Sequence, residues 1–172
     1  ETMKTIIIGL GNPILSDDGV GWKVAEALST ILPSTHLRHP SPTGRGDGGE
    51  GIIVVETASL GGLSLMERLE GYQRAILVDS MQTGLHPIGT VSLFPLNELP
   101  NPAESHSASA HDTSLMTALE TGCRMGLSLP HEVMVVAIEA RTVHDFSEEL
   151  SPEVAEAVPR AAQTVMDLLQ KK

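Results

Sequence analysis

Hydrophobic residues along this chain form two kinds of pattern, short continuous runs and stripes at helical spacing. The runs fall at residues 4–8, 51–56, 74–79, 89–94 and 132–139, and most are rich in Ile and Val, as buried strands are. The helical stripes begin near residues 20, 63, 115 and 154. This order predicts a three-layer α/β/α sandwich with a mixed, mostly parallel five-stranded sheet.

Local signals sharpen these expectations. The run at 89–94 follows the run at 74–79 so closely that the two are expected to pair as an antiparallel hairpin. Ser16 or Asp17 is expected to cap the first helix, Ser59 to cap the second, and Pro159 to kink the last. The side chains expected to face inward in the first three helices are Val20, Val24, Ala27, Leu28 and Ile31, then Leu63, Met66 and Leu69, then Leu115, Leu119 and Cys123.

Composition narrows the range of partners. The chain has 172 residues, 41% of them hydrophobic, which suits one domain over residues 3–172. Twenty-two acidic residues against 11 basic ones give a formal charge of −11, which opposes binding to nucleic acid or to anionic membranes. A single cysteine cannot form an internal disulfide, and there is no apolar run of about 18 residues. We therefore expect a cytoplasmic location.

The loop after the first strand is rich in glycine but does not match a nucleotide-binding motif. Counting from Gly9, the third glycine of G-x-G-x-x-G would fall at position 14, which is Ile14, and the chain has no G-K-[ST]. Asp17 and Asp18 would also repel a pyrophosphate at the following helix. The loop is suited to a cation or a proton, and no organic cofactor is expected.

Three polar residues stand at positions where α/β folds bind ligands. Asp18 follows the first strand, Asp79 ends the third, and His111 lies at the entrance of a helix. Two carboxylates and an imidazole could bind nickel, zinc, cobalt or manganese with open positions left over. Spacing alone leaves a second interpretation open, in which the aspartates cap a helix and a turn and His111 bonds to backbone.

Other candidate residues are weaker. His106 is an alternative ligand, and Cys123 falls on an apolar stripe, where a lone cysteine is more often a core residue than a nucleophile. No G-x-S-x-G elbow occurs. The remaining histidines that we considered are expected to be solvated or on the surface: His36, His39, His131 and His144.

Several segments together resemble the nickel-iron hydrogenase maturation endopeptidases, from about residue 3 to about 170. They are the opening motif at 7–21, Leu77-Val-Asp79, Ser109-Ala-His111, Ile138-Glu139, and Leu150-Ser-Pro-Glu-Val154 with Pro159. The resemblance implies a phosphorylase/hydrolase-like fold, and it implies that Asp18, Asp79 and His111 are the catalytic, metal-binding positions. It also implies that the protein removes a C-terminal extension from the hydrogenase large-subunit precursor after nickel insertion, with the nickel supplied by that precursor.

At least two positions of the chain depart from this family's pattern. Asp18 stands where some relatives have glutamate, and Glu56-Thr-Ala-Ser-Leu-Gly-Gly62 replaces an Asp followed by Gly-Gly-Thr. Two alternatives are kept. The segment Gly9-Leu-Gly-Asn-Pro13 also resembles the start of bacterial peptidyl-tRNA hydrolases, although the acidic charge opposes tRNA binding. A metal-dependent adaptor that escorts the precursor without cutting it would have much the same sequence.

Overall fold

The computed structural model describes residues 3–32, 51–98 and 110–171, without the side chains of residues 110–114. Its sheet has the strand order β2-β1-β3-β5-β4. The first four of these strands are mutually parallel, and β4 is antiparallel to β5 at one edge. The mixed five-stranded sheet is therefore as predicted. The strands are β1 (Lys4–Leu10), β2 (Ile52–Ala58), β3 (Arg74–Met81), β4 (Val91–Pro95) and β5 (Glu132–Glu139).

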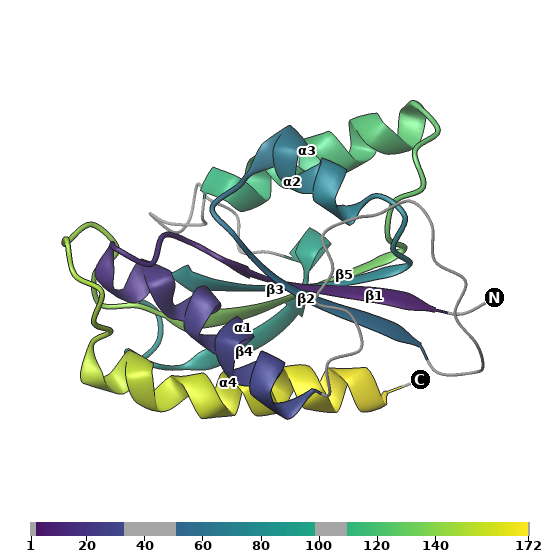
Figure 1. The fold of residues 1–172 in the computed structure, drawn as a ribbon. Coiled ribbons are helices and arrows are strands. Elements are labelled where there is room, and N and C mark those ends of the chain that lie inside the picture. Colours follow the sequence, from purple (N-terminus) through teal and green to yellow (C-terminus); the bar gives the residue numbers. More distant parts are fainter. Residues whose placement is uncertain (1–2, 33–50, 99–109, 172) are drawn as a thin grey trace.

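Helices cover both faces of this sheet. Helices α2 and α3 lie on one face, and α1 and α4 lie on the other (Figure 1). Along β1, Ile6 and Ile8 pack toward α2 and α3, while Ile7 packs toward α1 and α4, as the pleat of a strand buried on both faces requires. The helices are α1 (Val20–Ile31), α2 (Gly62–Leu69), α3 (Ala110–Arg124) and α4 (Pro152–Gln170), with short 3₁₀ turns η1 (Ser16–Gly19) and η2 (Leu96–Glu98).

The expected hairpin between the third and fourth strands is wrong. Strand β4 pairs with β5, and β5 lies between β3 and β4. The reason is burial: β5 is fully buried from Val135 to Glu139, whereas no residue of β4 is, so β4 suits the edge of the sheet. The chain therefore crosses the end of β5 between β3 and β4.

Both expected caps are also wrong. Helix α1 begins after Gly19, without a side-chain cap, because the Asp17 carboxylate bonds elsewhere. Ser59 Oγ donates to the carbonyl oxygen of Gly11 at 2.6 Å instead of capping α2. Ile31 and Leu63, expected inside, are 54% and 61% exposed. Helix α4 runs unbroken through Pro159, and a kink there stays a prediction.

The buried stripe of α3 differs from the predicted one. Leu115, Ala118 and Gly122 face the core, and Cys123 is exposed, so its expected place in the core is wrong. Positions three and seven residues apart stay on one helical face, whereas a step of eight drifts off it. Gly122, which has no side chain, packs closely against Met66 and gave no apolar signal.

The predictions about histidines can be compared with the structure only in part. His36, His39 and His106 lie outside the described residues, whereas His131 and His144 are exposed, as predicted. Within residues 3–32, 51–98 and 110–171, no helix has both the length and the apolar composition needed to cross a membrane.

Candidate functional site at the carboxyl ends of the strands

The loop after β1 folds back so that Asp18 lies against the start of that loop. Gly11 has φ +117°, and a Cβ at this position would collide with the carbonyl oxygen of Asp18. The Asn12 backbone N–H donates to Asp18 Oδ2 at 2.8 Å. Only glycine permits this close approach, which fixes the Asp18 carboxylate at the carboxyl end of β1.

Ser80 links the two predicted aspartates. Its hydroxyl donates to Asp18 Oδ1 at 3.1 Å, and its backbone N–H donates to Asp79 Oδ1 at 2.8 Å. Asp79 is 3% exposed and Asp18 is half-buried. Ser80 thus contacts both carboxylates, one on β3 and one in the loop after β1. Sequence analysis missed Ser80, although a second polar residue directly after Asp79 in an apolar strand was a usable signal.

The third predicted residue lies on an element that starts at the same end of the molecule. Helix α3 begins at the end of the sheet where β1 and β3 finish (Figure 1), and His111 is the second residue of that helix. Its side chain is outside the described residues. Among the side chains that are described, no three residues of the types His, Cys, Asp or Glu are arranged so that they could hold a metal ion.

Asp17, next to Asp18, has a different environment. It is fully buried, and its carboxylate accepts hydrogen bonds from the backbone N–H groups of Arg141, Thr142 and Ser151 at 2.8, 3.3 and 2.7 Å. The Ser151 hydroxyl also donates to it. Asp17 therefore ties the loop between β5 and α4 to the first loop, which is a structural role.

Glu139 is a second buried carboxylate near this edge. It is 1% exposed and accepts the backbone N–H groups of Thr83 and Gly84 at 2.9 and 2.8 Å, together with the Thr83 hydroxyl at 2.8 Å. It thereby anchors the turn that follows β3. The Ile138-Glu139 pair contributed to the family resemblance, but no pattern in the sequence indicated this contact.

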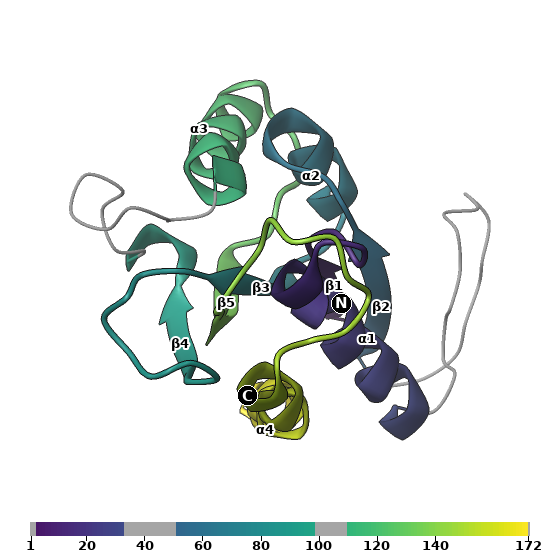
Figure 2. The ribbon, with the colours of Figure 1, turned by 90° about the vertical axis from the view of Figure 1, so that its left-hand side faces the viewer.

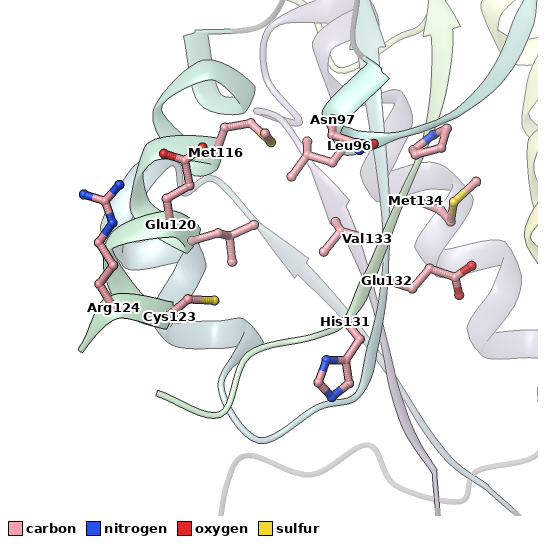
Figure 3. A pocket seen from close by; sticks show the side chains of 12 residues that line it. Leu96, Asn97, Met116, Glu120, Cys123, Arg124, His131, Glu132, Val133 and Met134 are labelled. Carbon is pink, nitrogen blue, oxygen red and sulfur yellow. The ribbon is translucent and has the colours of Figure 1, made fainter. Parts of the chain in front are cut away.

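A pocket of about 580 Å³ lies away from the two aspartates. Figure 3 shows Cys123 and Arg124 on its helical side, and His131 and Val133 on its strand side. Its strand residues end at Met134, three residues before the Ala137 that pairs with Asp79, a separation of roughly 10 Å along the strand. The pocket includes neither Asp18 nor Asp79.

Comparisons with known proteins agree on one family. The family model described as hydrogenase maturation protease matches residues 52–168. A Methanocaldococcus jannaschii protein, provisionally named as a hydrogenase maturation protease, is 28% identical over 170 residues, covering 96% of each chain.

Two solved structures share the fold. The hydrogenase maturating endopeptidase HybD from E. coli has a TM-score of 0.71 at 21% identity, covering 98% of this chain and 93% of its own. The HybD maturation protease from Thermococcus kodakarensis has a TM-score of 0.66 at 22% identity, covering 98% and 100%. These likenesses bear out the α/β fold.

Proposed function

This chain belongs to the hydrogenase maturation protease family, and we propose that it removes the C-terminal extension from the large-subunit precursor of a nickel-iron hydrogenase. In this proposal Asp18, Asp79 and His111 bind the nickel that the precursor already carries. The metal is therefore part of the substrate, and no organic cofactor takes part. The precursor is the protein partner.

The observation that carries this proposal is the link through Ser80. Two carboxylates distant in sequence share one serine at the ends of neighbouring parallel strands, where α/β sheets place their ligand sites. Asp18 is half-buried, and Asp79 is almost fully buried. Carboxylate and imidazole together suit a divalent metal of nickel's type and leave positions for ligands from the precursor.

The small number of protein ligands in the proposed site would make cleavage conditional on nickel insertion. A site with two carboxylates and one imidazole binds a free ion weakly, but it binds well to an ion that the precursor holds in place, because the second contact is then intramolecular. The nickel so held would polarise the scissile carbonyl or activate a water. A precursor without nickel lacks that bridge and is left uncut.

The test is processing of a nickel-loaded precursor, followed by mass spectrometry. Asp18→Asn and His111→Ala are each expected to slow release of the C-terminal peptide by more than about 100-fold, the upper range for losing an outer-shell partner of a metal ligand. Asp167→Asn, which removes an exposed carboxylate on α4, serves as the matched control. Unimpaired processing by either of the first two variants would remove the assigned role.

The same measurement separates the protease from a non-cleaving adaptor. The protease releases a C-terminal peptide from the nickel-loaded precursor and leaves the nickel-free precursor intact. An adaptor binds the loaded precursor without changing its mass. Equal cleavage of both precursor forms would contradict the proposed recognition of nickel while leaving a protease.

A further inference from the structure

The loops at the carboxyl ends of the strands carry unusually exposed apolar side chains. Phe146, in the loop after β5, is 85% exposed, and Ile14, in the loop after β1, is 47% exposed. The chain has only two phenylalanines, one tyrosine and one tryptophan, so this position exposes one of its few aromatic rings. Exposed aromatic residues of this kind are enriched among the anchors of protein interfaces.

The two segments that carry these side chains lie side by side. The Ser147 N–H donates to the Ile14 carbonyl at 3.1 Å, the Ser16 N–H donates to the Ser147 carbonyl at 2.7 Å, and the Ser16 hydroxyl donates to the Glu149 carbonyl at 3.2 Å. Figure 2 shows the loop after β5 passing over the first turn of the chain at this end of the sheet. Ile14 is therefore paired with Ser147, and Phe146 is the residue directly before Ser147.

This loop is fixed in place before any partner arrives. The buried Asp17 carboxylate holds its first residues, Arg141 and Thr142, and also its last, Ser151. Thr142 Oγ1 donates to Asp145 within the loop at 3.0 Å. Because its backbone is already ordered, the loop loses little conformational entropy when a partner binds to it.

The charges around Phe146 indicate the chemistry of the partner. Asp145, Glu148 and Glu149 are exposed next to it, and the one arginine of the loop, Arg141, is paired with Glu153. An acidic rim around an apolar centre attracts a basic segment and repels an acidic one. The rim adds to a chain whose formal charge is already −11.

We propose that Ile14 and Phe146, with Asp145, Glu148 and Glu149 around them, form a docking surface for the precursor. It takes a segment in which an apolar side chain is flanked by basic residues. This inference rests on the proposed function, because the surface lies on the same loops as Asp18 and presents the partner to that site. Ile14 is four residues from Asp18, whose own N–H is bonded to the Leu15 carbonyl.

The experiment compares exposed apolar residues at opposite ends of the sheet. Phe146→Ser is tested against Met125→Ser, since Met125 is 73% exposed just past the end of α3, at the far end of the sheet (Figure 1). Initial rates of tail release are measured over a range of nickel-loaded precursor concentrations. Phe146→Ser is expected to raise KM about 10-fold or more with kcat unchanged, the size typical of an interface anchor. Met125→Ser should match the wild type, and Phe146→Leu should recover most of the loss.

A second set of variants tests the contribution of the acidic side chains to precursor binding. The double change Glu148→Gln with Glu149→Gln should raise KM and weaken its dependence on salt, whereas Glu70→Gln, an exposed change at the end of α2, should do neither. An unchanged KM for Phe146→Ser would overturn the docking surface while leaving the protease intact. If the wild type binds precursor without cutting it, and Phe146→Ser weakens that binding, the surface is supported and the proposed function fails. No measurable binding by the wild type would overturn both.

Discussion

Removing the Asp17 carboxylate should unfold this protein at much lower denaturant concentrations, although Asp17 touches no proposed reactant. The group is fully buried and accepts three backbone N–H groups and one hydroxyl, all from the segment between β5 and α4. In Asp17→Ala, those donors lose their acceptor. The adjacent Asp18 does not reach them, because its oxygens are bonded to Asn12 and Ser80.

The size of the effect follows from these bonds. A hydrogen bond to a charged acceptor contributes about 1.5–3 kcal/mol, and leaving a buried partner unpaired costs a similar amount. Three backbone donors would give more, but Thr142 and Ser151 are half-buried, so water can reach part of the gap. We expect a loss of about 3–5 kcal/mol, the range for breaking a buried charged network. For a chain of this length that corresponds to a fall in Tm of roughly 10 °C.

Urea unfolding, followed by the fluorescence of the single tryptophan, measures this loss. Trp22 lies in the first turn of α1 and donates from its indole nitrogen to the Ala58 carbonyl, so its signal reports on the packing around the first loop. Asp145→Ala is the matched control, because its exposed carboxylate accepts one hydroxyl and should change stability by under about 0.5 kcal/mol. If Asp17→Ala costs no more than Asp145→Ala, the structural role assigned to Asp17 is refuted.

Three further predictions concern other parts of the fold. Gly11→Ala should destabilise by at least about 2 kcal/mol in urea unfolding, because φ is positive there and the added Cβ meets backbone; a neutral change would contradict the geometry. Glu139→Ala should cost about 2–4 kcal/mol, because the turn at Thr83 loses its acceptor, and proteolysis should then cut that turn faster than in the wild type. Burial, and then the Glu56 charge, raise the pKa of Tyr72, the only tyrosine. The contribution of Tyr72 to the free energy of unfolding is therefore fully present below its pKa in the unfolded chain, near 10. That contribution is lost as the pH rises through the higher pKa of the folded protein. Absorbance of the phenolate should show a higher midpoint in the folded than in the unfolded chain, and coincident midpoints would contradict this.

The continuous apolar runs and helical stripes were enough to predict the layers and the sheet. A strand that is buried over most of its length, such as β5, leaves an unmistakable apolar run, and its predicted bounds at 132 and 139 match the structure. The pairing of β4 was not predictable in the same way. Closeness in sequence favoured β3 as the partner of β4. The actual pairing depends on which strands lie inside the sheet with a neighbour on each side, and that is a property of the whole sheet.

Helix capping was the least predictable local feature, because a polar side chain can bond either to the end of the helix or to another part of the fold. Ser59 could cap α2, yet its hydroxyl reaches the Gly11 carbonyl on a different strand's loop. The stripe of α3 failed for a related reason, since Gly122 fills a buried position without an apolar side chain and moves Cys123 to the surface. In each case a tertiary contact outweighed a preference that is worth about 1 kcal/mol or less.

The pair Asp17 and Asp18 shows where sequence reasoning about the site ends. Both are carboxylates in one Gly-rich loop, and both fit a cation site by type and place. The 3₁₀ turn at Ser16–Gly19 projects consecutive side chains about 120° apart, so Asp17 points into the packed loop before α4 and Asp18 points toward Ser80. Rotation within one turn thus separates a carboxylate that holds the loop before α4 from one that bonds to Ser80 and that, in our proposal, binds the metal. If the proposed function holds, Asp17→Asn and Asp18→Asn must differ in kind: the first should lower stability and leave kcat in the folded fraction, and the second should do the reverse.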